Sequence, residues 1–223
     1  MLIRFIRWKI IDYRSFEDET LTLLPNQGHC NLNFSFEKEG KKYHLRKYKL
    51  ADRDRKLEFK IQNLAFKKGI GAKAYYHDKS IMIGDFIEGV HQKKLCKKEL
   101  RLLALTIKKL HKIKLRKKPT LFPQAKNFKK ELVLCHGDLS VKNILFTQRV
   151  KLIDWEYAGV CDRYFDLASV CLEFKLNKAE EAYFFRAYGI KIVHKKLKVY
   201  KDVFMRLSKE WFEKLEKGEL DFI

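Results

Sequence analysis

Proline and glycine are scarce in this sequence: 223 residues include only three prolines and ten glycines, while 46% of the residues are hydrophobic. This composition excludes intrinsic disorder and collagen-like repeats, because nearly half of the chain can be buried. No apolar run is long enough to cross a membrane. Residues 1–11 are basic and apolar, but their apolar runs are too short for the hydrophobic region of a secretion signal. We therefore expect a cytoplasmic protein in which residues 1–11 pack on an N-terminal sheet rather than lie on a membrane.

Paired or closely spaced cysteines are also missing. The five cysteines form an odd, widely spaced set without a C-x-x-C motif. This pattern argues against a disulfide framework and against a zinc site, and it favours reduced thiols in a cytosolic chain.

Acidic residues are too few to balance the basic ones. The chain has 49 Lys and Arg against 28 Asp and Glu, which gives a net charge of +21. Such a charge attracts anions such as nucleotides, nucleic acid or acidic membrane faces. The lysines are scattered in pairs, and no nucleic-acid-binding motif is present, so we expect a solvated basic surface and no nucleic-acid partner.

The apolar pattern predicts an α+β fold, with a strand-rich first third and a mostly helical remainder. Spacing of three to four residues predicts helices over 52–68 and 100–111, and again after Asp166. We place a boundary between two lobes near residues 84–90, with residues 1–85 as a β-rich nucleotide lobe and 86–223 as a helical catalytic and substrate lobe. Short apolar or alternating runs predict strands at 21–24, 31–37, 43–48, 74–76, 80–83, 132–135, 144–146 and 150–153.

Three polar residues follow predicted strands: Asp138, Asn143 five residues later, and Asp154 sixteen residues after Asp138. Phosphoryl transfer from ATP needs a carboxylate that accepts the hydroxyl proton and oxygen ligands that hold Mg²⁺ against the phosphates. Asp138 fits the first task, and Asn143 and Asp154 fit the second. The alternative, in which these residues only cap turns and end a hairpin, does not require all the parts in this order.

The motif His136-Gly-Asp-Leu-x3-Asn-Ile-Leu has the spacing of a kinase catalytic loop. Together with Ile153-Asp-Trp-Glu and Phe165-Asp-Leu-Ala168, it resembles the aminoglycoside phosphotransferase and choline kinase superfamily, and within it bacterial choline kinase-like proteins. The resemblance implies a two-lobed, protein-kinase-like fold with a small antiparallel-sheet lobe and a mainly helical C-terminal lobe. It also implies an ATP- and Mg²⁺-dependent kinase of a small molecule, in which Asp166 holds the backbone of the catalytic loop.

The same resemblance extends to the first third of the chain. The segment from Gly28 to Phe34 is similar to a phosphate-binding loop, although Cys30 replaces the usual Thr. Arg46 matches the basic residue that reaches the nucleotide phosphates, and Glu58 matches its ion-pair partner. The resemblance therefore implies an ATP site formed by Gly28, Asn31, Arg46, Glu58 and the segment Asp85, Phe86 and Ile87, whose backbone would hold adenine.

The sequence gives less evidence about the molecule that accepts the phosphoryl group than about the nucleotide site. Glu173 stands seven residues after Asp166, as in choline kinases, and Ser208-x2-Trp211 resembles their aromatic region. A cation against an aromatic face gains up to about 2 kcal/mol when desolvated, so we expect Glu156, Glu173 and Trp211 to bind choline or a related amino alcohol. Ethanolamine, thiamine and aminoglycosides stay open as acceptors, and the hydrophobic core is an equal alternative to the substrate site for Trp211. A non-catalytic basic protein with a kinase-like shell is the alternative to an enzyme.

Overall fold

The computed structural model describes residues 21–25, 27–115, 125 and 127–220 of the chain. The expected packing of residues 1–11 on the sheet lies outside these ranges. Within them, no helix combines the length and the apolar character needed to cross a membrane.

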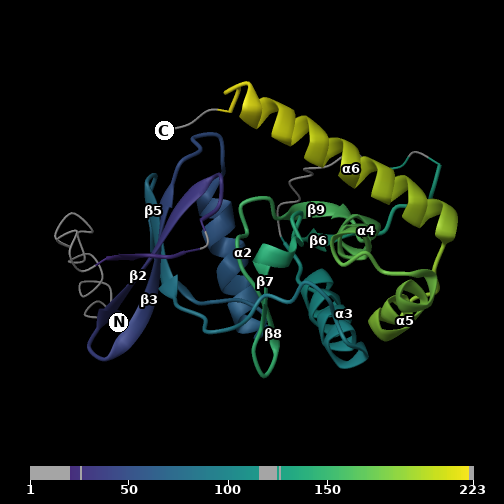
Figure 1. Ribbon diagram of the computed structural model, residues 1–223, viewed down its shortest axis with the longest axis horizontal. Helices are drawn as coiled ribbons and strands as arrows, with labels where there is room; N and C mark the ends of the chain where they lie inside the picture. The colour runs from purple at the N-terminus through teal and green to yellow at the C-terminus, as the bar shows by residue number, and fades with distance from the viewer. Residues whose placement is uncertain (1–20, 26, 116–124, 126, 221–223) are drawn as a thin grey trace.

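The first part of the chain forms a five-stranded antiparallel sheet with the order β1-β2-β3-β5-β4, drawn at the left of Figure 1. Its strands are β1 (Thr22–Leu23), β2 (Asn31–Lys38), β3 (Lys41–Tyr48), β4 (Ala74–His77) and β5 (Ile81–Asp85). The predicted hairpin at Glu39-Gly40 is confirmed: Lys38 pairs with Lys41, and the two residues between them have φ angles of 52° and 70°. Positive φ at both central residues matches the right-handed twist of the flanking strands.

Helix α2 (Arg55–Lys67) connects β3 to β4. Its start is fixed by Asp54, whose side chain accepts a hydrogen bond from the backbone N–H of Leu57, so one of the unpaired amides of the first turn is satisfied. Beyond its last residue, Gly69 adopts a φ of 71°, as predicted for the residue that ends the helix. The buried face of α2 carries both apolar residues, such as Ile61, and the polar pair Arg55 and Glu58.

The rest of the chain is mainly helical and contains two small antiparallel pairs, β6 with β9 and β7 with β8. Strand β9 was not expected, because its four residues follow the Asp154 motif without an alternating pattern. In chain order the elements are α3 (Lys97–His111), β6 (Leu132–Cys135), the 3₁₀ turn η3 (Val141–Asn143), β7 (Ile144–Phe146), β8 (Val150–Leu152), β9 (Gly159–Asp162), α4 (Tyr164–Glu173), α5 (Lys178–Tyr188) and α6 (His194–Glu216).

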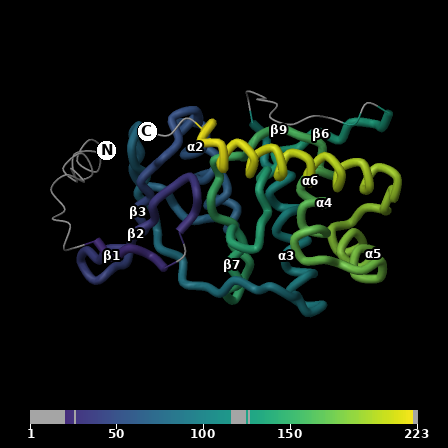
Figure 2. Tube along the Cα trace, turned by 45° about the horizontal axis from the view of Figure 1, so that its top comes forward, coloured from purple at the N-terminus to yellow at the C-terminus, as the bar shows by residue number. Residues whose placement is uncertain are grey.

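Helix α6 runs back from the helical part toward the sheet (Figures 1 and 2). Only its first turns are deeply buried, through Lys196, Leu197 and Tyr200. Near its other end, the ring of Trp211 lies 5.6 Å from the ring of His29, in the loop before β2. The last helix therefore joins the two parts of the molecule at a point far from its own anchor.

The largest hydrophobic cluster is centred on the helical part, where Trp155 and Phe165 are fully buried. Ile61 and Ala65 of α2 belong to the same cluster, so α2 packs on the helical part although it lies in the first third of the sequence. A separate cluster covers the sheet through Phe36, Leu45, Ile81 and Ile83. The division of the chain at residue 85 stays a prediction.

Candidate active site

The loop after β6 is held by a buried carboxylate. The backbone N–H groups of His136 and Gly137 donate to the two oxygens of Asp166, at 2.8 and 3.0 Å. The same carboxylate lies 3.0 Å from Nε2 of His111, whose Nδ1 lies 2.7 Å from the hydroxyl of Tyr188. Asp166 is fully buried, so these contacts replace the water that its charge would otherwise need.

Asp138 and Asn143 meet directly within this loop. The amide nitrogen of Asn143 donates to Oδ2 of Asp138 at 2.7 Å and to its backbone oxygen at 3.0 Å. Both bonds use Nδ2, so the amide oxygen of Asn143 stays available as an acceptor or metal ligand.

Asp154 is brought to the same place by the backbone. The N–H of Ile153 donates to the carbonyl of Asn143 at 3.0 Å, and Asp154 follows with a φ of 65°. Asp is one of the few residues that adopts this left-handed conformation readily. Its Oδ1 accepts from Arg46 at 2.9 Å.

Arg46 sits at the centre of an ion-pair network between the sheet and the helical part. Its Nη1 lies 2.9 Å from both Glu58 and Asp154, and its side chain is only 5% exposed. Arg55 extends the network by pairing with Glu58 at 2.9 Å and with Glu156 at 3.1 Å. No role was predicted for Arg55, although its position three residues before Glu58 on the same helix places the two side chains together.

The start of β2 reaches this network through Asn31. Its amide nitrogen donates to Oε2 of Glu156 at 3.3 Å, and its amide oxygen is buried and has no hydrogen-bond partner among the described residues. Cys30 is buried, with its sulfur 3.9 Å from the hydroxyl of Tyr157, so the residue that replaces Thr faces a phenol. A side chain at Gly28 would meet no atom within 4 Å, which leaves the loop open there.

The segment expected to hold adenine is only partly free to do so. The backbone N–H of Asp85 donates to the carbonyl of Lys73, and its carboxylate accepts from Tyr75 at 2.7 Å and pairs with Lys41 at 2.6 Å. In the part of the chain that the structure describes, no hydrogen bond uses the backbone of Phe86 or Ile87. These two residues therefore have the backbone groups that a base could reach.

The three residues expected to bind the acceptor have different contacts and do not contact one another. Oε2 of Glu173, the last residue of α4, accepts from the backbone N–H of Val141 in the catalytic loop at 3.3 Å. Trp211 contacts His29 and Phe212 instead, and it is not a member of the large hydrophobic cluster. Glu156, also expected to bind the acceptor, has a side chain only 3% exposed and is paired with Arg55.

Carboxylates crowd this region. Burial, together with the charges of Asp154 and Glu173, raises the pKa of Asp138 to about 7. Burial and the charge of Asp154 likewise raise the pKa of Glu156 to about 7. Burial also raises the pKa of Glu173. A bound cation would relieve this repulsion.

The donor set fits Mg²⁺. This ion prefers carboxylate and amide oxygens, and it needs only one or two carboxylates when phosphates supply further ligands. Asp154 offers Oδ2, which makes no hydrogen bond among the described residues, and Asn143 offers its amide oxygen.

Comparison with known proteins supports this interpretation of the motifs. The model of the phosphotransferase enzyme family matches residues 91–200. These residues form a phosphotransferase family domain. Two curated relatives, both named protein LicA from Haemophilus influenzae, are 33% and 32% identical over 36% of this chain. The matches span 35% and 28% of their lengths, so the chain aligns with about a third of these relatives.

Solved structures extend the likeness from the phosphotransferase domain to the whole fold. Choline kinase LicA from Streptococcus pneumoniae has a TM-score of 0.73 at 21% identity, covering 99% of this chain and 92% of that one. Ethanolamine kinase from Plasmodium vivax has a TM-score of 0.69 at 18% identity, over 89% and 76%. A spectinomycin phosphotransferase in complex with ADP and spectinomycin has a TM-score of 0.64 at 14% identity, over 81% and 78%. The predicted kinase-like α+β fold is thereby confirmed.

Proposed function

We propose that the protein transfers the terminal phosphoryl group of ATP to the hydroxyl group of choline. The observation that carries this proposal is the 2.7 Å hydrogen bond between Asn143 and Asp138, formed in a loop to which Ile153 ties Asp154. It groups one carboxylate that can take a proton with two oxygen donors for a metal. The phosphotransferase family match over residues 91–200 contains all three residues.

Each residue in the site then has a task. Asp138 orients the acceptor hydroxyl and takes its proton as the oxygen attacks phosphorus. Asn143 and Asp154 would hold Mg²⁺, which when bound neutralises charge on the phosphate oxygens. Arg46 uses only Nη1 for its two ion pairs, so its other guanidinium nitrogens can donate to phosphate oxygens.

The remaining predicted ATP contacts follow the same arrangement. Glu58 orients Arg46, while Gly28 and Asn31 form an open loop that would cover the phosphates. The free backbone groups of Phe86 and Ile87, next to Asp85, would hold adenine. Two solved neighbours, LicA with AMP and the spectinomycin enzyme with ADP, contain nucleotides and support ATP as the donor.

Choline is the preferred acceptor because of one carboxylate and one aromatic side chain. Glu173 accepts a hydrogen bond from Val141 in the catalytic loop, three residues after Asp138, and its carboxylate would attract the ammonium group. Trp211 would cover the methyl groups of a quaternary amine. Choline kinase LicA among the structural neighbours supports this choice, and the ethanolamine kinase keeps the smaller amine as a rival. A cytoplasmic location would give such an enzyme its ATP.

A panel of acceptors tests the proposal. ADP release with Mg-ATP should be fastest with choline and slower with ethanolamine, thiamine or an aminoglycoside. Asp138→Ala should abolish release while Mg-ATP still raises the melting temperature, since binding to the folded state stabilises it. Asp202→Ala, at an exposed position on α6, is the matched control and should behave as the wild type.

Three results would contradict the proposal. Turnover by Asp138→Ala at the wild-type rate would contradict the role of Asp138 as the base. A preference for another acceptor would contradict choline as the substrate. A melting temperature that does not respond to millimolar Mg-ATP would favour a non-catalytic basic protein.

A further inference from the structure

Positive charge is concentrated on one segment of the chain. Residues 91–115 contain eight lysines and one arginine against a single acidic residue, Glu99, which gives this segment a net charge of +8. Glu99 accepts a hydrogen bond from the backbone of Cys96 at the start of α3. Among the described residues, Glu99 forms no ion pair with these cations.

Most of these cations share one face of α3. At 3.6 residues per turn, six of them fall within an arc of about 120°. The buried residues of the helix, such as Leu103, Ile107 and Leu110, lie on the opposite side. We name this surface the basic face; it consists of Lys97, Lys98, Arg101, Lys108, Lys109 and Lys112.

The described part of the chain offers the basic face no acidic partners. Among the residues that the structure describes, none of its six cations forms an ion pair with a carboxylate. The turn between β7 and β8 adds further charge beside it: burial, then the charges of Arg149 and Lys109, lower the pKa of Lys151. Cations this close repel one another, and a negatively charged surface would remove that repulsion.

We propose that the basic face docks the protein on an anionic lipid surface. Lysines near a layer of acidic headgroups each add to binding without needing a defined contact geometry. Leu105 lies in the middle of the face and is partly exposed. Its apolar side chain can enter the headgroup layer beside the lysine stems.

The composition of the segment favours lipid over nucleic acid. Residues 91–115 contain no Phe, Tyr or Trp on which a base could stack, and lysine outnumbers arginine eight to one. Arginine is the side chain that grips single phosphates with two hydrogen bonds, whereas lysine acts as a point charge. The point charges of lysine therefore match a diffuse anionic layer better than a single phosphate.

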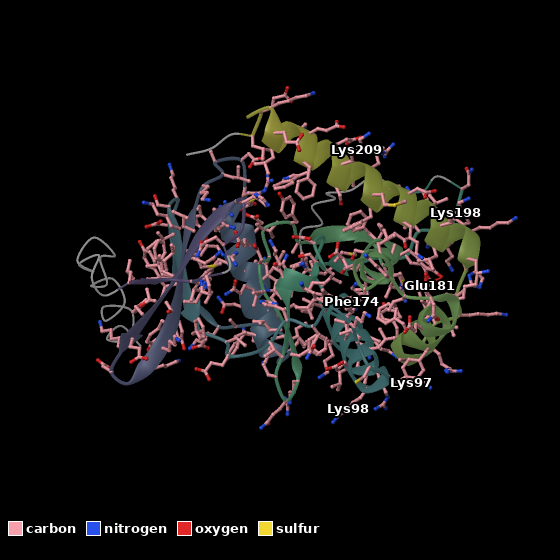
Figure 3. All side chains as sticks on the ribbon, viewed as in Figure 1. Lys97, Lys98, Phe174, Glu181, Lys198 and Lys209 are labelled. Atoms are coloured by element: carbon pink, nitrogen blue, oxygen red, sulfur yellow. The ribbon has the colours of Figure 1, made fainter. Side chains whose placement is uncertain are left out.

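The position of the face also suits docking. Figure 3 shows Lys97 and Lys98 at the lower edge of the molecule, whereas Lys198 and Lys209 project from α6 along the upper edge. A membrane held by α3 would therefore leave α6 and the loop that it contacts uncovered. The attraction would act on the basic edge and not on the acidic site.

Flotation with lipid vesicles tests this proposal without relying on catalysis. The full chain should float with vesicles containing about 30% phosphatidylglycerol in phosphatidylcholine, but not with pure phosphatidylcholine, and salt should release it. The triple variant Lys98→Glu, Arg101→Glu, Lys109→Glu should reduce the bound fraction at least about tenfold. The matched control is Lys191→Glu, Lys195→Glu, Lys198→Glu, with the same charge change on exposed residues elsewhere, and it should lose less than about threefold.

The melting temperature of each variant checks that the fold is intact. To separate a local effect from unfolding, neutral substitutions Lys98→Gln, Arg101→Gln, Lys109→Gln should give an intermediate loss. The proposal is overturned if the wild type does not float, or if the two charge-reversal variants lose binding equally, which would reflect net charge alone. Tighter binding to a short DNA duplex, lost in the α3 variant, would assign the face to nucleic acid instead.

Discussion

Arg46 and Asp154 form an ion pair of 2.9 Å between strand β3 and the segment after β8, 108 residues apart in the chain. The same nitrogen of Arg46 also pairs with Glu58. The carboxylate proposed to bind metal is thus held beside the side chain proposed to bind phosphate before either ligand arrives. Such a preset arrangement reduces the ordering that a nucleotide complex would otherwise require.

Removal of Arg46 tests how much the fold depends on this pair. Arg46→Met would leave Glu58 and Asp154 without their shared cation, and loss of one partner from a buried ion pair costs about 3–5 kcal/mol. Urea unfolding should show this decrease in the free energy of unfolding. Lys47→Met, exposed on the same strand, should change it by less than about 0.5 kcal/mol. An equal effect of the two substitutions would contradict the buried role of Arg46.

The metal-binding role of Asp154 can be separated from its backbone role. Asp154→Asn keeps a residue that tolerates a φ of 65°, but removes the charge that attracts Mg²⁺. We expect the folded protein to lose most of its thermal stabilisation by Mg-ATP. Asp202→Asn serves as the control, and an undiminished shift in Asp154→Asn would rule out this residue as a ligand.

Tyr188 should support the catalytic loop through His111. Tyr188→Phe removes the hydroxyl that lies 2.7 Å from Nδ1 of His111, and the loss of one buried hydrogen bond costs about 1 kcal/mol. Addition of His111→Gln should then cost less than in the wild type, because the two residues act together. Tyr183→Phe on the same helix is the control for the phenol itself. Additive losses would show that the two rings are independent.

His44 should make stability depend on pH. Burial and the charge of Arg46 lower its pKa from 6.5 to about 3, and Nε2 lies 3.1 Å from the amide oxygen of Asn33. Because the folded protein binds a proton less readily than the unfolded chain, the stabilisation is present above pH 6.5 and is lost as the pH falls toward 3. The slope is at most about 1.4 kcal/mol per pH unit, and solvent contact of this partly exposed residue reduces it.

Urea unfolding between pH 7 and 4.5 measures this effect. His44→Gln should flatten the dependence on pH, whereas His194→Gln, at an exposed position, should leave it as in the wild type. If the slopes of all three proteins agree, other groups govern the acid response.

Trp211 should matter for the acceptor more than for the nucleotide. Trp211→Ala should raise the KM for choline at least about tenfold, since a desolvated cation–aromatic contact is worth up to about 2 kcal/mol. The KM for Mg-ATP should change much less. Met205→Ala removes another half-exposed apolar residue of α6 and should alter neither constant. A larger effect on Mg-ATP would place Trp211 over the nucleotide loop through its contact with His29.

Much of the fold could be predicted because local patterns and tertiary structure agree. The alternation over β2 and β3, with Glu39-Gly40 between them, predicts a hairpin that the structure contains. The helical spacing before His111 is likewise found as α3. Strand β9 was not predicted, because its four residues are all buried and show no alternation of apolar and polar side chains.

In the candidate site, sequence patterns predict contacts within one loop but not contacts between distant segments. The spacing from Asp138 to Asn143 predicts a shared loop, and the two side chains do meet. By contrast, nothing in the local sequence joins Arg55 to Glu156, which lie 101 residues apart. Such a pair depends on how α2 packs against the helical part, which only the three-dimensional structure gives. For the same reason the sequence did not reveal that Trp211 faces His29.

The placement of α2 limits which part of the molecule can swing. Ile61 and Ala65 are sealed into the interior of the helical part, and the backbone N–H of Leu152 donates to the carbonyl of Ile70 just beyond α2. On its other side α2 also holds the sheet, through two hydrogen bonds between Asn63 and Ala74 of β4 and through a further apolar cluster. Neither part of the molecule can therefore swing on α2 alone, so we expect the sheet, α2 and the catalytic loop to shift together when a nucleotide binds.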